Sequence, residues 1–117
     1  IRGIAQVGGG ATKHNTCAGP VAAMIWHNPK DNLVAFSQGL IARDAIKAQN
    51  QLGNRNVPVE PLWAHCVAYT DGQKDAPLEW CPHTQDFEDY GSKAFYPHVW
   101  PKNAGAEIWK FFEGLDK

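Results

Sequence analysis

Hydrophobic and polar residues follow one another along this chain in stretches that predict strands and helices in turn. Residues 20–27 read PVAAMIWH, a run that is apolar up to its final histidine. A continuous apolar run of this length is typical of a strand buried on both faces, as in parallel sheets. The run stops at NPKDN, residues 28–32, which is a dense turn signal. The earlier stretch IAQVGG, residues 4–9, predicts a short strand that ends in a glycine turn.

Two segments have the periodicity of amphipathic helices. The first runs from Phe36 to about Asn50, and its apolar residues share one face. These residues are Ile41, Ala42, Ala45 and Ile46. The second follows Asn103, which we expect to be its N-cap. Its apolar side consists of Ile108, Phe111, Phe112 and Leu115.

Two further strands, residues 64–69 and 78–83, are expected to form a hairpin around Asp71 and Gly72. The order of strands and helices indicates an α/β fold. With about two core parallel strands, the chain is too short for a whole doubly wound sheet. It also opens on a strand rather than on Met, so we expect a fragment or a processed chain.

Composition narrows the possible partners. The chain has 117 residues, 44% of them hydrophobic, and a net charge of -1, which suits one domain of modest size. Lys and Arg are scattered, so no basic surface for nucleic acid is expected. No apolar run approaches the length of a membrane span. We therefore expect neither nucleic acid nor a membrane as a partner.

The chain has three cysteines, Cys17, Cys66 and Cys81, so it forms at most one internal bridge. Cys66 and Cys81 flank the predicted hairpin. A bridge between them would stabilise the fold by roughly 3 kcal/mol and would imply an oxidising, secreted setting. The alternative is three buried, reduced thiols in a cytosolic protein.

Two residues with acid–base chemistry follow predicted strands. Asp31 lies in the turn after the most apolar strand, and His98 lies in the loop before the last helix. Functional residues of open α/β sheets gather beyond the carboxyl ends of the strands. An Asp followed much later by a His is the chain order of the last two members of an α/β-hydrolase triad. Pro97 and Pro101 each fix a φ angle and would stiffen the loop that carries His98.

The segment HNPKDNLVAF resembles the H-G-x-x-D-x-x-V-P motif of feruloyl esterases and polyhydroxybutyrate depolymerase-like enzymes, which are secreted α/β-hydrolases. His27, Asp31 and Val34 match in place, whereas Asn28 replaces the family's Gly and Ala35 its Pro.

The segment PHVWPKNAGAEIWKFF resembles the G-H-x-W-P loop of the same family, followed by A-x-x-I-W-x-F-F. The matching residues are His98, Trp100, Pro101, Ile108, Trp109, Phe111 and Phe112. Pro97 stands where Gly is usual. The hairpin with Cys66, Trp80 and Cys81 resembles the family's C-x-x-Y…W-C insertion. The resemblance thus covers most of the chain.

By this resemblance Asp31 is the triad acid and His98 is the triad base. We also expect Trp100 to contact the substrate, and Cys66 and Cys81 to form a disulfide. No metal or organic cofactor is implied. The implied substrates are feruloyl or acetyl esters of plant polysaccharide, with polyhydroxyalkanoate as the second choice, and the implied location is secreted.

The chain departs from the family in one large respect, because it has no G-x-S-x-G nucleophile elbow. Its two serines, Ser37 and Ser92, are predicted in a helix start and in a polar loop. We therefore expect residues 1–117 to be the C-terminal portion of a single α/β-hydrolase domain, incomplete on its own. The nucleophilic serine would lie on an N-terminal portion or on a second chain.

Two other classes of function compete with the hydrolase. A structural zinc module could use residues from three clusters of metal-capable side chains, although their spacings are not those of a pair of C-x-x-C knuckles. The clusters are His14 with Cys17, His65 with Cys66, and Cys81 with His83. The other alternative is a non-catalytic α/β interaction domain.

Overall fold

The computed structural model describes residues 2–10, 19–72, 75–88 and 91–115. Within these ranges the chain forms one sheet of five strands, in the order β1-β2-β5-β4-β3. In chain order the strands are β1 (Gly3–Val7), β2 (Ala22–Trp26), β3 (Asn56–Pro58), β4 (Val67–Tyr69) and β5 (Leu78–Cys81). The helices are α1 (Phe36–Gln49), the 3-10 helix η1 (Leu62–Ala64) and α2 (Ala104–Gly114).

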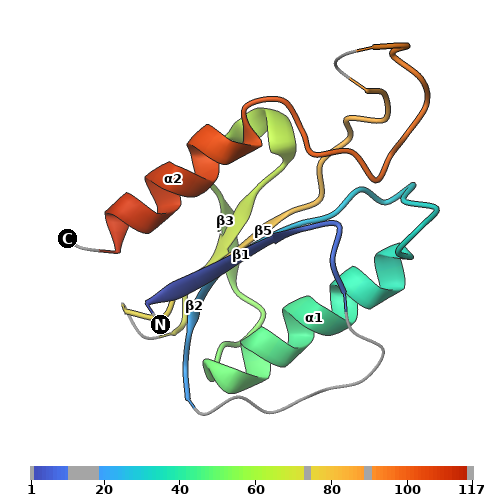
Figure 1. Ribbon diagram of the computed structural model, residues 1–117. Helices are drawn as coiled ribbons and strands as arrows, with labels where there is room; N and C mark the ends of the chain where they lie inside the picture. The colour runs from blue at the N-terminus through green and yellow to red at the C-terminus, as the bar shows by residue number, and fades with distance from the viewer. Residues whose placement is uncertain (1, 11–18, 73–74, 89–90, 116–117) are drawn as a thin grey trace.

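The sheet is mixed. Strands β1, β2 and β5 are parallel, whereas β4 and β3 continue the sheet in antiparallel pairs. Helix α2 covers one face of the sheet and α1 covers the other (Figure 1). The α/β class expected from the sequence is confirmed, but the parallel part has three strands rather than two.

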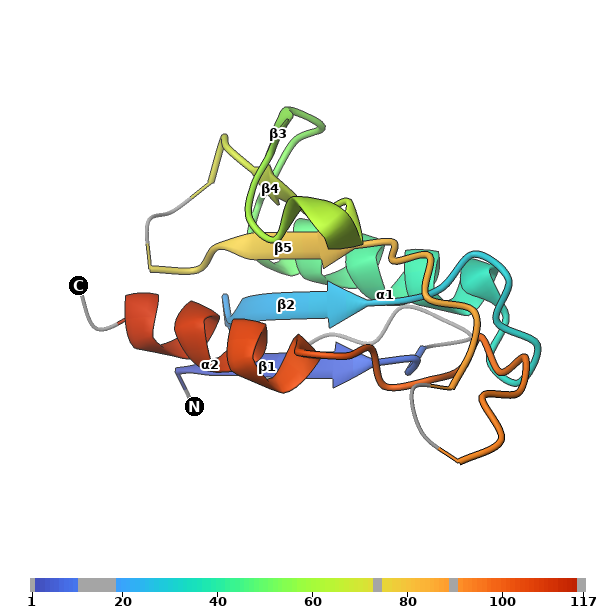
Figure 2. The same ribbon diagram turned by 90° about the horizontal axis from the view of Figure 1, so that it is seen from above.

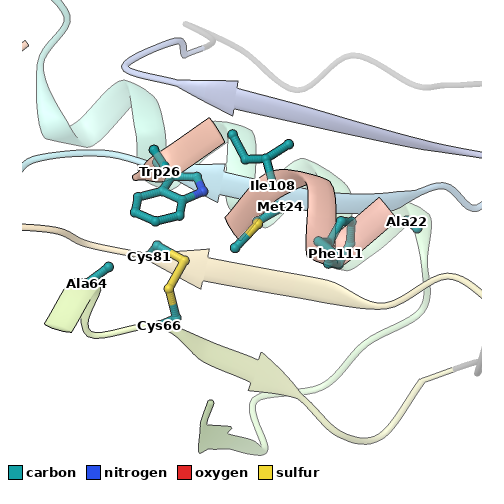
Figure 3. Packing of buried hydrophobic residues seen from close by; sticks show 9 residues of the cluster. Ala22, Met24, Trp26, Ala64, Cys66, Cys81, Ile108 and Phe111 are labelled. Atoms are coloured by element: carbon teal, nitrogen blue, oxygen red, sulfur yellow. A yellow bond between two sulfur atoms is a disulfide. The ribbon is translucent and has the colours of Figure 1, made fainter. Parts of the chain in front are cut away.

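Strand β2 supplies both cores, because its five residues are all buried. Met24 and Trp26 point to the α2 face, where they pack with Ile108 and Phe111 (Figure 3). Ala23 and Ile25 belong to the second cluster, on the α1 face. The rest of that cluster consists of Ile46, Leu78 and Trp80. The prediction of a strand buried on both faces is confirmed.

A disulfide joins Cys66 to Cys81, as the sequence led us to expect. Val67 pairs with Trp80 in the antiparallel ladder, so the bridge continues the β4–β5 hairpin by one step. The two sulfur atoms lie within the core on the α2 face (Figure 3).

The structure adds to the local expectations and corrects some of them. The strand expected from residue 64 begins at Val67, because Ala64 belongs to η1, and β3 was not foreseen at all. Asn103 occupies the N-cap position of α2 in a left-handed conformation, with φ 67°, and its side chain makes no cap hydrogen bond. Trp109, which matches the family motif, is 64% exposed on α2.

The three parallel strands all end at the same edge of the sheet, and two long loops lie beyond their carboxyl ends (Figure 2). One loop, residues 27–35, follows β2 and carries Asp31. The other, residues 82–103, follows β5 and carries His98. The helices among the described residues are too short or too polar to cross a membrane.

Candidate active site

The carboxylate of Asp31 is buried within its own turn. Its Oδ1 atom accepts hydrogen bonds from the backbone N–H groups of Leu33 and Val34, at 2.9 and 2.8 Å. The backbone N–H of Asp31 donates to the Asn28 carbonyl at 3.0 Å, which closes the turn. The NPKDN sequence thus folds so that its own peptide groups hold the carboxylate.

These donors decide the charge of Asp31. Burial alone would raise the pKa of the carboxyl group, because a buried charge loses its hydration. Hydrogen bonds from the Val34 N–H, the His98 ring and the Leu33 N–H outweigh burial, and with the attraction of His98 they hold the pKa of Asp31 below its ordinary value. Asp31 is therefore ionised at neutral pH.

Residues 97–101 alternate between the interior and the surface. Pro97, Val99 and Pro101 are buried, whereas the side chain of His98 is 26% exposed and Trp100 is 59% exposed. The Val99 N–H donates to the Tyr96 carbonyl at 3.1 Å. Three anchored neighbours thus hold His98 at the surface, and the two prolines restrict the backbone as expected.

The two loops bring Asp31 and His98 into contact across 67 residues of sequence. The Nδ1 atom of His98 lies 2.7 Å from Oδ2 of Asp31. An ionised carboxylate only accepts hydrogen bonds, so Nδ1 of His98 carries a hydrogen, and in the neutral ring Nε2 is the nitrogen with a free lone pair. This is the arrangement that a general base requires, and the expected contact is present.

A glycine packs directly against this pair. Gly8 follows β1 with φ +69°, and a Cβ at this position would lie 2.8 Å from Cε1 of His98. Its N–H donates to the Trp26 carbonyl at 2.9 Å, which ties the end of β1 to β2. The sequence showed a glycine turn here, but it gave no sign that the turn lies against His98.

Asn28 joins the Asp31 loop to the His98 loop. Its Nδ2 atom donates to the Gln85 carbonyl and to Oδ1 of Asp86, both at 2.8 Å. Lys30 contacts the other Asp86 oxygen at 3.1 Å. The hydrogen bond from Asn28 and the Lys30 charge hold the pKa of Asp86 below its ordinary value. Sequence reasoning noted Asn28 only as a departure from a family Gly.

The remaining site predictions have mixed outcomes. Ser37 is exposed on α1, and Ser92 contacts Glu88 at 3.4 Å; no hydrogen bond joins either serine to His98. Trp100 is exposed two residues from His98, and its contact with substrate stays a prediction. Two other tryptophans, Trp26 and Trp80, belong to the core.

The zinc alternative loses two of its ligands, because Cys66 and Cys81 are bonded to each other. Within the described ranges, no group of three or more His, Cys, Asp or Glu side chains is placed to hold a metal ion. Burial, with the nearby His27, lowers the pKa of His83 to about 4. His14 and Cys17 lie outside the described residues.

No protein-family model matches this chain, and no curated protein matches it significantly. The case for a function therefore rests on the geometry of Asp31 and His98.

Proposed function

We propose that this chain supplies the acid and the base of a serine carboxylic-ester hydrolase. The observation that carries the proposal is the 2.7 Å contact between Nδ1 of His98 and Oδ2 of Asp31. The surroundings of the two side chains also support the proposal. Asp31 is buried and held by two backbone N–H groups, whereas His98 reaches the surface.

The proposed reaction is a two-step acyl transfer. Nε2 of His98 takes the proton of a serine hydroxyl as the serine oxygen attacks the ester carbonyl, and then gives that proton to the departing alcohol. Water, activated by the same nitrogen, next releases the acid and restores the serine. Asp31 stabilises the imidazolium that forms in each step.

The nucleophilic serine is proposed to lie outside this chain, on an N-terminal portion or on a second polypeptide. Neither Ser37 nor Ser92 bonds to His98, and Nε2 of His98 is the atom such a serine would approach. The disulfide supports an oxidising location, and we propose that the protein is secreted.

The substrate proposed is a feruloyl or acetyl ester of plant polysaccharide. Exposed aromatic side chains on the loop that carries His98 support an aromatic acyl group. Tyr96 packs edge-on to the His98 ring with centroids 6.1 Å apart, and Phe87 and Phe95 form a second pair at 5.6 Å. Trp100 adds a further exposed ring on the same loop.

The test begins with the coding sequence around this chain and with any polypeptide that co-purifies with it. A G-x-S-x-G strand–turn–helix in either place identifies the missing part. The complete protein should hydrolyse p-nitrophenyl acetate and methyl ferulate. Asp31→Asn should lower kcat/KM by roughly 10⁴-fold, because the base loses its orienting carboxylate.

Asp44→Asn is the matched control. Asp44 is paired with Arg43 on the surface of α1, and this change should leave kcat/KM unaltered. Turnover by the 117-residue chain alone at the rate of the complete protein would contradict the proposal. So would full activity of Asp31→Asn.

A further inference from the structure

A second histidine lies beside Asp31, completely buried, and the acyl-transfer mechanism does not use it. His27 follows β2, and its Nε2 atom is 2.8 Å from the Val34 carbonyl oxygen and 3.6 Å from Oδ2 of Asp31. A carbonyl only accepts, so Nε2 carries the hydrogen. His27 and His98 thus face the same carboxylate oxygen with opposite tautomers.

The other nitrogen of His27 is closed off by helix α1. Its Nδ1 atom is buried and has no hydrogen-bond partner among the described residues. A Cβ at Gly39 would lie 2.6 Å from this atom, so the helix backbone packs directly on the ring. Phe36, also on α1, contacts the ring edge-on, with the two ring centroids 5.8 Å apart.

The bond from His27 to Val34 closes the loop that holds Asp31. Val34 is also one of the two residues whose N–H groups bind Oδ1 of Asp31. Fixing the Val34 carbonyl therefore fixes the position of that N–H donor. The same bond occupies the single N–H of His27, which leaves Oδ2 of Asp31 to His98.

We infer that His27 is a positioning residue for the Asp31–His98 pair, acting through the Val34 carbonyl. It sets the turn that presents Asp31, and the bare Nδ1 under Gly39 keeps the required hydrogen on Nε2. The inference rests on the proposed function for its catalytic meaning. Its structural content is independent of ester turnover.

The experiment follows the His98 ring by NMR in the purified, oxidised 117-residue chain. In the wild type, Nδ1–H of His98 should give a downfield proton resonance, and the ring nitrogens should report the Nδ1–H tautomer. His27→Leu removes the bond to Val34 and should abolish that resonance. His27→Gln offers an amide N–H near the position of Nε2 and should restore it.

A second pair of variants tests the ring pocket without touching either histidine. Gly39→Ala should displace His27 and weaken the His98 resonance. Gly105→Ala is the matched control, because Gly105 also lies in a helix but a Cβ there meets no atom within 4 Å. Ala is favoured over Gly in helices by about 1 kcal/mol, and both substitutions gain this preference. Helix propensity therefore cannot explain a His98 resonance that is lost in Gly39→Ala and kept in Gly105→Ala.

The results that would overturn the inference differ from the result that would overturn the proposed function. An unchanged His98 resonance in His27→Leu overturns the inference, and so does equal loss in His27→Gln and His27→Leu, which would indicate simple packing. If His27→Leu does not fold by near-UV circular dichroism, the comparison of Gly39→Ala with Gly105→Ala decides. The proposed function fails by a different result, namely normal ester hydrolysis by Asp31→Asn in the complete protein.

Discussion

The two loops that meet at the candidate site are stabilised in different ways. Residues 27–35 hold Asp31 through hydrogen bonds: two backbone N–H groups bind its carboxylate, and His27 binds the Val34 carbonyl. Residues 97–101 hold His98 through burial of its neighbours Pro97, Val99 and Pro101. Among the described residues, the His98 side chain bonds to Asp31 alone.

The difference fits the roles proposed for the two residues. A buried carboxylate remains ionised only if donors replace its lost hydration, so the acid needs its bonds within its own loop. A base has to present a free nitrogen to a reactant, so it cannot be fixed by bonds to that nitrogen. Packing of adjacent residues fixes it instead.

The largest expected effect on stability comes from the disulfide at the root of the His98 loop. Cys81 ends β5, and residues 82–103 begin directly after it. Replacing Cys66 and Cys81 with Ala should lower the free energy of unfolding by about 3 kcal/mol, because it removes a loop constraint on the unfolded chain. Urea unfolding measures this loss.

Hydrogen exchange on the same double variant sharpens the comparison. Amides of residues 82–103 should lose more protection than those of residues 27–35, since the Asp31 loop has no covalent anchor to lose. Equal loss in both loops would show that they depend on the disulfide to the same extent.

A smaller effect is expected within the alternating segment. Val99→Ala removes buried methyl groups and should destabilise the chain by about 2 kcal/mol. Trp100→Ala, one position along, should change stability by less than about 0.5 kcal/mol, because Trp100 is mostly exposed. Thermal unfolding of both variants measures the difference. If both substitutions destabilise the chain equally, burial of the neighbouring residues does not anchor the His98 loop.

The smallest expected effect is the dependence of stability on pH in acid. The pKa of Asp31 is lower in the fold than its ordinary value of 3.8, so the unfolded chain takes up this proton first as pH falls. The stabilisation is therefore present above pH 3.8 and is lost as pH falls through the lower folded pKa. Asp31→Asn lacks this dependence.

Urea unfolding of wild type and Asp31→Asn from about pH 6 to about pH 3 checks the sign. The stability difference should be constant at the upper end and should narrow at the lower end. A difference that widens in acid would mean that the donors around Asp31 do not favour its charged form.

Many of the strands and helices could be predicted, because they depend on the local pattern of apolar and polar residues. The apolar run at residues 20–27 predicts a strand buried on both faces, and the helical periodicity from Phe36 ends where α1 ends. The hairpin followed from its turn residues, and the disulfide was expected from the two flanking cysteines together with the family resemblance. The contact between Asp31 and His98 could be expected because strand ends of one sheet meet at one edge.

The details that position the site could not be predicted, since they depend on contacts between distant segments. Nothing near Gly8 indicates that a ring packs against it. The bonds of Asn28 reach residues 85 and 86, in a loop with no regular pattern. Asn103 has the sequence of a cap, yet a left-handed backbone removes its side chain from that role.

Residues 97–101 alternate between buried and exposed positions, so substitutions in this segment have two different kinds of effect. Substitutions at the inward positions alter how well the chain folds, whereas substitutions at Trp100 alter only what the loop presents to its surroundings. Under the proposed function, a loop of this construction can change the side chain it presents to a substrate while its histidine stays in register with Asp31. Selection on specificity and selection on folding would then act on different residues of the same five-residue segment.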